Sequence, residues 1–316
     1  MRIVFLGTPA FAVASLEALV KGGQQVVAVI TAADKPAGRG LTLRQSPVKI
    51  AALNHHLPVL QPQKLTDPEF LKEVKSFQPD LMIVVAFRMM PEILWAMAPL
   101  GTFNLHASLL PQYRGAAPIN RAIMNGETMT GVTTFFLKQQ IDTGNIIFRE
   151  QVPIGADETA GELHDKLMKT GAELVLRSVQ AIEQSKVVPI AQETLTDSTT
   201  LLRTAPKLFP DDCKINWNQP AGTIHNQIRG LSPSPGATTH FISDTARLQI
   251  KLFRSAKAGN GSVSDPGTIA IESGRLFVHC ATGKIEVLEL QQQGKKRLSA
   301  AEFLRGFRAS SQWRAE

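Results

Sequence analysis

Apolar residues in the first part of the chain occur in short continuous runs. The runs 2–6, 25–30 and 80–86 are rich in aliphatic side chains, which predicts strands of a parallel sheet that is covered on both faces. Between the first two runs, Phe11, Leu16 and Leu19 fall on one face of a predicted helix over 11–21. This order predicts a βαβ opening and a doubly wound, Rossmann-like α/β domain.

Helix-capping patterns indicate two further helices. Asp67, Pro68 and Glu69 supply an N-cap, a first-turn proline and an early acid for a helix that we expect to end near residue 77. Thr159 and Glu162 have the spacing of a capping box ahead of a long amphipathic helix, which we expect to close the first domain. The segments 131–138 and 146–152 are predicted as two more strands.

The pattern changes after residue 185. Residues 186–206 contain prolines and a polar tract without periodicity, which predicts a linker. Short strands are then predicted at 248–253, 267–271, 275–279 and 285–290, and Ser299 with Glu302 predicts a cap for a final short helix. We therefore expect a first domain over 1–185 and a smaller all-β, barrel-like (OB-like) domain or sandwich over 207–316.

Composition is that of an ordinary globular protein, with 43% hydrophobic and 19% charged residues among 316. The N-terminal apolar run fits a strand better than a signal peptide, and the longest apolar run, 81–87, is too short to cross a membrane. Cys213 and Cys280 are the two cysteines, which fits a reducing cytoplasm and argues against a zinc site. We expect no metal.

Positive charge is concentrated towards the C-terminal end. Residues 1–185 contain 17 Lys or Arg against 16 Asp or Glu, whereas residues 186–316 contain 17 against 11. This asymmetry indicates either a polyanionic partner or a basic surface that is merely solvated.

A long segment rich in proline and glycine follows the second predicted strand. Residues 31–49 are too many for a βα turn, so we predict a surface loop, and Lys35, Arg39, Arg44 and Lys49 make it basic. We favour a loop that faces nucleic acid over a flexible insertion. Residues 7–10 have one glycine where a dinucleotide fingerprint has three, which argues against a nicotinamide dehydrogenase.

Residues 102–121 concentrate side chains that folding alone does not require. Phe103 and Leu105 alternate with Asn104 and His106, so a strand would present the polar pair on one face. An amide that can donate to a carbonyl oxygen, beside an imidazole that titrates near neutrality, suits acyl chemistry on an amine. A capped loop with a structural histidine is the alternative. Asp142 lies in an Asp-Thr-Gly sequence that is either turn chemistry or a partner for His106.

Several of these motifs together resemble the methionyl-tRNA formyltransferases along nearly the whole chain. The similar segments are N-L-H-A-S-L-L-P-Q-Y-R-G-A-A-P-I at 104–119, G-T-P-A-F-A at 7–12, D-K-P-A-G-R-G at 34–40, S-P-V-K at 46–49 and Q-I-D-T-G at 140–144. Related enzymes that formylate glycinamide ribonucleotide or amino sugars share the Asn-x-His and the distant Asp. They do not usually share the 34–40 loop followed by a basic β domain.

The resemblance implies transfer of a formyl group from 10-formyltetrahydrofolate to the α-amine of methionine on initiator tRNA. It implies that Asn104, His106 and Asp142 form the catalytic trio, with Asn104 donating to the developing oxyanion and His106 either shuttling a proton or stabilising charge. It assigns the folate signature to Ser108, Leu109, Leu110 and Pro111.

The same resemblance implies that Arg39 enters the tRNA acceptor stem, with Lys35 adding charge nearby. Lys295, Lys296 and Arg297 form a basic turn that either contacts phosphates or is solvated. Residues 86–91 are one residue shorter than in many members, near the expected pterin pocket. An enzyme for a sugar amine or glycinamide ribonucleotide, and an inactive tRNA-binding homologue, stay open as alternatives.

Overall fold

The computed structural model describes the chain except residues 38–41, 198, 200, 260–263 and 308–312. It divides into two compact units, each made of three stretches of the chain. Unit 1 contains Met1–Gly115, Thr130–Val152 and His164–Thr204, and unit 2 contains Ala116–Met129, Pro153–Leu163 and Ala205–Glu316. The domain borders at 185 and 206 stay a prediction.

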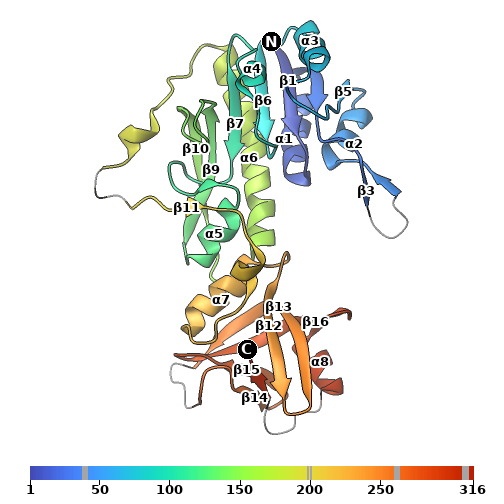
Figure 1. The fold of residues 1–316 in the computed structure, drawn as a ribbon. Helices are drawn as coiled ribbons and strands as arrows, with labels where there is room; N and C mark the ends of the chain where they lie inside the picture. Colours follow the sequence, from blue (N-terminus) through green and yellow to red (C-terminus); the bar gives the residue numbers. More distant parts are fainter. Residues whose placement is uncertain (38–41, 198, 200, 260–263, 308–312) are drawn as a thin grey trace. The chain divides into compact units, whose positions relative to one another are not determined.

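A seven-stranded sheet forms the centre of unit 1, in the order β10-β9-β7-β6-β1-β2-β5 (Figure 1). The strands are β1 (Arg2–Gly7), β2 (Gln25–Ile30), β5 (Val59–Leu60), β6 (Leu81–Val85), β7 (Thr102–His106), β9 (Met129–Phe136) and β10 (Ile146–Pro153). Neighbours from β5 to β7 pair in parallel, and β9 pairs antiparallel with β7. The predicted doubly wound α/β class is confirmed.

Helices cover both faces of this sheet. On one face, α3 (Pro68–Ser76) and α4 (Glu92–Trp95) share an apolar cluster with alternate residues of β1 and β6. On the other face, α6 (Ala160–Glu183) packs so closely that a Cβ on Gly171 would lie 2.7 Å from Leu105 Cδ2. Helix α1 (Ala10–Lys21) connects β1 to β2 as predicted.

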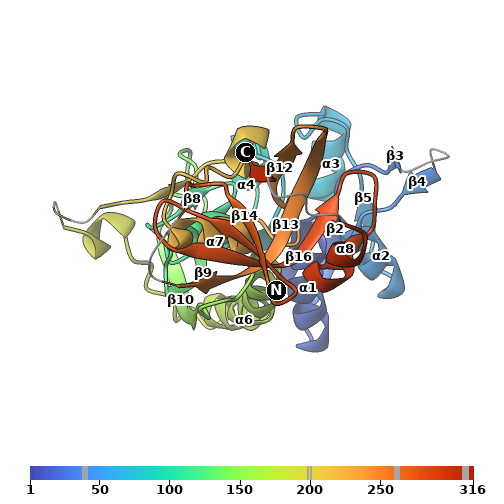
Figure 2. The same cartoon turned by 90° about the horizontal axis from the view of Figure 1, so that it is seen from below.

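The predicted caps are present. Asp67 accepts hydrogen bonds from the backbone N–H groups of Glu69 and Phe70, and Glu162 and Thr159 bond reciprocally before α6. The described part of the segment 31–49 is more regular than predicted. Its β3 (Lys35–Ala37) and β4 (Thr42–Arg44) pair as an antiparallel hairpin, which projects beside α2 (Pro47–Asn54) in Figures 1 and 2. Ser46 caps α2, and this signal of a capping serine before proline was missed.

Unit 2 contains a second sheet in the order β14-β15-β16-β13-β12-β18, with β17 added beside β16. Its strands are β12 (Ala237–Ser243), β13 (Ala246–Ala258), β14 (Ile269–Glu272), β15 (Arg275–His279), β16 (Lys284–Gln292), β17 (Arg297–Ser299) and β18 (Arg314–Ala315). These neighbouring strands pair antiparallel. The predicted antiparallel second sheet is thus confirmed.

Unit 2 also contains helices, so it is less purely β than predicted. They are α5 (Pro118–Met124), α7 (Ala221–Gly230) and α8 (Ala300–Gly306). The capping box of Ser299 and Glu302 before α8 is confirmed. Helix α7 was not predicted, although buried Ile224, Ile228 and Leu231 recur at helical spacing. Short elements elsewhere are β8 (Arg114–Gly115), β11 (Thr204–Ala205) and the 3₁₀ helices at Gln192–Leu195 and Pro210–Cys213. In the described part of the chain, no helix is both long and apolar enough to cross a membrane.

Candidate active site

The polar face of β7 places two of the three predicted catalytic side chains next to each other. Leu105 packs towards α6, so the alternation of the strand directs Asn104 and His106 to the opposite face. His106 is buried and Asn104 is half-buried. Asp142, from the loop between β9 and β10, joins them, with its Oδ2 3.9 Å from His106 Nδ1.

The hydrogen bonds of His106 distinguish its two ring nitrogens. Nε2 lies 2.9 Å from the backbone oxygen of Tyr113, which can only accept, so Nε2 carries the proton that it donates. In the neutral ring, Nδ1 is therefore the nitrogen without a hydrogen. Its distance of 3.9 Å from Asp142 Oδ2 suits charge attraction and is too long for a direct hydrogen bond.

Two loops hold this arrangement with unusual backbone geometry. Tyr113 has φ +59° and Asp142 has φ +55°, both in the left-handed region that residues other than glycine rarely adopt. Asp142 Oδ2 accepts a hydrogen bond of 3.0 Å from the backbone N–H of Gly115. The backbone oxygens of Asp142 and Gly144 accept from the side chain of Gln192. Gln192, in the predicted linker, was missed by the sequence analysis.

The turn predicted to bind folate is fixed by its neighbours. Thr133 Oγ1 donates to the backbone oxygen of Ser108 at 2.6 Å and accepts from the backbone N–H of Leu110 at 3.1 Å. Ser108 and Leu110 are fully buried, Pro111 is buried and Leu109 is half-buried. Leu109 thus has the only partly exposed side chain of these four residues. Their contact with folate stays a prediction.

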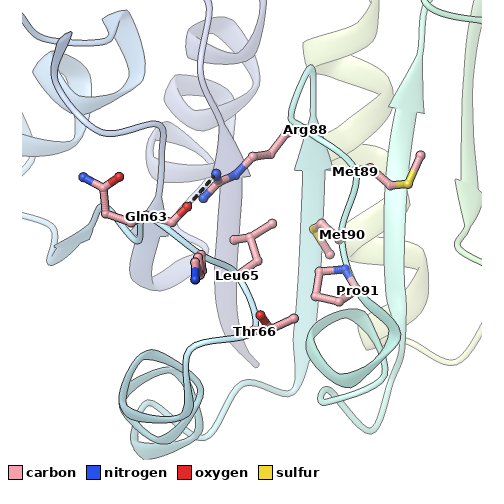
Figure 3. A pocket seen from close by; sticks show the side chains of 8 residues that line it. Gln63, Leu65, Thr66, Arg88, Met89, Met90 and Pro91 are labelled. Atoms are coloured by element: carbon pink, nitrogen blue, oxygen red, sulfur yellow. Dashed lines mark hydrogen bonds between the residues drawn. The ribbon is translucent and has the colours of Figure 1, made fainter.

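A pocket of about 370 Å³ lies beside the shortened segment 86–91, between the segments that follow β5 and β6 (Figure 3). Its lining residues are Gln63, Lys64, Leu65, Thr66, Arg88, Met89, Met90 and Pro91. The Arg88 guanidinium donates to the backbone oxygens of Pro62 at 2.7 Å and Gln63 at 3.1 Å. Its hydrogen bonds therefore link the two segments that form the pocket.

The basic candidates differ in their surroundings. Lys35 is exposed on β3, and Arg39 lies outside the described residues. Lys295 and Lys296 are exposed in the turn between β16 and β17. Arg297 is paired with Glu289, and its guanidinium carbon lies 4.2 Å from the centre of the Phe253 ring. Arg297 therefore already has intramolecular partners that Lys295 and Lys296 do not share.

Among the residues that the structure describes, no three His, Cys, Asp or Glu side chains are grouped in a way that could hold a metal ion. The expectation that no metal is required stays a prediction.

The sequence and fold define the class of protein. A family model described as formyl transferase matches residues 1–179, and a second, described as formyl transferase, C-terminal domain, matches residues 207–308. The chain belongs to the formyl transferase family, which confirms the resemblance, and it is a one-carbon transferase.

Individual relatives are named for a more specific activity than the family model is. The methionyl-tRNA formyltransferase of Bacteroides fragilis is 51% identical over 97% of this chain and 95% of its own length. That of Flavobacterium johnsoniae is 46% identical over 99% of this chain and 98% of its own length. A solved N-formyltransferase from Helicobacter canadensis, in complex with folinic acid and dTDP-3-aminofucose, is 23% identical. It has a TM-score of 0.64, with 92% of this chain and 98% of that chain covered, and supports the fold alone.

Proposed function

We propose that this chain transfers the formyl group of 10-formyltetrahydrofolate to the α-amine of methionine esterified to initiator tRNA. The observation that carries the proposal is the identity of 51% to a methionyl-tRNA formyltransferase over 97% of the chain. The face of β7 that presents Asn104 and His106 beside Asp142 supplies groups for that chemistry. The proposal includes the predicted cytoplasmic location.

The reaction needs a donor for an oxyanion and a base for one proton. The neutral α-amine attacks the formyl carbon, a C–N bond forms, and the carbonyl oxygen gains negative charge. We assign the Asn104 amide to donate to that oxygen, because a fixed donor is most effective where charge develops. The bond from the formyl carbon to the folate nitrogen then breaks, and its electron pair stays on that nitrogen.

His106 handles the proton in this proposal. The attacking nitrogen loses one proton and the leaving folate nitrogen gains one, so a single group that accepts and then donates completes the balance. We assign this role to Nδ1, because Nε2 donates to the backbone of Tyr113. The Asp142 carboxylate, 3.9 Å from Nδ1, favours the protonated ring while it carries the proton.

We assign folate to the predicted turn 108–111 and to the region of the pocket beside Met89 and Met90, where apolar surface is available for a pterin ring. We assign the tRNA to Lys35 and Arg39 in the first basic segment and to Lys295, Lys296 and Arg297 in unit 2. These contacts rest on the family resemblance and on the positive charge of residues 186–316.

The test is a substrate panel with 10-formyltetrahydrofolate as donor. Charged initiator tRNA, a nucleotide-linked amino sugar and glycinamide ribonucleotide are each offered to the full-length chain, and formylated product is measured. We expect formylated product from charged initiator tRNA and from neither small amine. If the amino sugar or glycinamide ribonucleotide were formylated instead, that compound would be the substrate and the proposal would be wrong. Binding of tRNA without formylation of any acceptor would indicate an inactive homologue.

A further inference from the structure

Gln192 is fully buried although it lies in the segment that the sequence predicts to be a linker. It opens the 3₁₀ helix Gln192–Leu195. Its Nε2 donates to the backbone oxygens of Asp142 at 2.9 Å and Gly144 at 2.8 Å. Its Oε1 accepts from Arg114 Nε at 3.1 Å and Nη2 at 2.6 Å. Both donors and both acceptor positions of this amide are thus in use.

These bonds hold the backbone of a residue that needs support. Asp142 has φ +55°, a left-handed conformation that aspartate tolerates better than most residues but that still costs free energy, so bonds from its surroundings help to hold it. Gln192 fixes the main chain on the carbonyl side of Asp142 and again two residues later. The direction of the Asp142 carboxylate therefore depends on an amide from a distant part of the sequence.

The second partner of Gln192 connects it to the other side of the site. Arg114 lies between Tyr113, whose backbone oxygen accepts from His106, and Gly115, whose N–H donates to Asp142. Three successive residues thus bond to three parts of the site: Tyr113 to His106, Arg114 to Gln192 and Gly115 to Asp142. Arg114, Gln192, Asp142 and Gly115 are thus joined in a closed cycle, and His106 is attached next to it through Tyr113.

We propose that Gln192, oriented by Arg114, is a positioning residue for Asp142, so that part of the segment 186–206 belongs to the formyl-transfer site. This inference rests on the proposed function. The side chain of Gln192 bonds to Arg114 and to the backbone of Asp142 and Gly144, so it acts through the placement of Asp142.

The kinetic test uses Gln192→Met, which keeps the size of the side chain and removes its hydrogen bonds. We expect kcat to fall by about 10- to 100-fold, the range for a small misplacement of a catalytic group. KM for folate and for tRNA should change by less than about threefold, because no substrate contact is removed. The wild-type chain is assayed beside it, so a failure of the proposed function shows as absent wild-type activity.

Gln112→Met is the matched control. Gln112 also ties the segment 186–206 to the loop after β7, since its Nε2 donates to the backbone oxygen of Leu201 at 2.9 Å and its Oε1 accepts from the backbone N–H of Arg203 at 2.9 Å. Its side chain bonds to the backbone of Leu201 and Arg203 and not to the loop of Asp142. An equal loss of kcat in both variants would mean that the segment acts by general packing, and the inference would be wrong.

A second readout reports on Asp142 without any substrate. The N–H of Gly115 donates to the Asp142 carboxylate, so its hydrogen exchange should accelerate in Gln192→Met and stay unchanged in Gln112→Met. If Gln192→Met does not fold, Gln192→Glu provides the same comparison, because it places a carboxylate against two backbone oxygens. Unchanged Gly115 exchange together with wild-type kcat in the variant that folds overturns the inference.

Discussion

Two polar clusters in this molecule are built from similar parts. In unit 1, His106 lies near Asp142, and a buried Gln192 donates to two backbone oxygens of the neighbouring loop. In unit 2, His225 lies near Asp157, and a buried Arg229 donates to the backbone oxygens of Gly155 at 3.2 Å and Glu158 at 3.0 Å. Each cluster fixes an irregular segment by bonds from a side chain to main-chain oxygens.

The clusters differ in how the histidine nitrogens are used. His225 bonds through both, with Nδ1 3.1 Å from Ser255 Oγ and Nε2 3.1 Å from Asp157 Oδ1. Asp157 is 75% exposed, whereas Asp142 is 11% exposed and lies 3.9 Å from the remaining nitrogen of His106. In the reaction that we propose, one histidine nitrogen must be left to take up the proton, and of these two residues His106 meets that condition.

The largest expected effect comes from the chemistry itself. Asn104→Ala should lower kcat by about 10²- to 10³-fold, the usual loss for one oxyanion donor, and His106→Ala should lower it similarly. His225→Ala is the control in the other cluster and should leave the kcat of the folded enzyme within a few-fold. Single-turnover formylation measures all three. Near-native turnover by the Asn104 or His106 variant would contradict the catalytic assignment.

Substitutions in the second cluster should lower the stability of the folded protein. Arg229→Met leaves two backbone oxygens without their charged donor, and we expect the free energy of unfolding to fall by about 2–3 kcal/mol. Arg254→Met, which removes an exposed pair with Glu162, should cost less than about 1 kcal/mol. Urea unfolding compares the variants. An equal cost for both would remove the distinction between the buried cluster and a surface ion pair.

The pH dependence of stability should distinguish His225 from an ordinary surface histidine. Burial lowers the pKa of His225, opposed by the Ala156 carbonyl and Asp157 and reinforced by Arg229 and Lys257. The unfolded chain therefore takes up a proton at a higher pH than the folded chain. The stability that neutral His225 contributes to the folded chain is fully present above about pH 6.5, the ordinary histidine pKa. It is lost as the pH falls through the lowered pKa of the folded state.

His225→Gln cannot take up that proton, so its free energy of unfolding should fall less between pH 7 and pH 5 than that of the wild type. The measurement is urea unfolding at both values. An identical pH dependence in the two proteins would show that His225 does not titrate with unfolding.

The smallest effect concerns the basic turn of unit 2. Replacing Lys295 and Lys296 by Gln should reduce the slope of log affinity for tRNA against log salt by up to about 1.4–1.8, if both touch phosphate. Adding Arg297→Gln should change it less, because that guanidinium is paired with Glu289. If Arg297→Gln reduced the slope as much as each lysine substitution, Arg297 would have to leave Glu289 when tRNA binds. If the slope were unchanged in all variants, the turn would be solvated and would not contact tRNA.

The sequence was most informative where a pattern is local. The alternation in β7, the caps before α3, α6 and α8, and the apolar runs of the parallel sheet each depend on residues within one turn or strand. From them follow the α/β class and the face that presents Asn104 and His106. The approach of Asp142 to His106 could be named only as a possibility, because no local pattern sets that distance.

Gln192 shows why the rest could not be predicted. Its partners Asp142 and Arg114 lie 50 and 78 positions away in the sequence, and a glutamine in a polar tract gives no local signal of burial. The same holds for Arg229, which bonds to backbone oxygens more than 70 positions away. Such contacts depend on the tertiary structure and not on periodicity.

The division of each unit into three stretches limits how this protein can be dissected. No single cut releases either unit whole. A fragment that ends at residue 185 would contain all seven strands of the first sheet and would lack Gln192, the donor to the backbone of Asp142. Fragments or chimaeras that borrow this sheet therefore have to include residues up to 204 if they are to keep the loop of Asp142 in place.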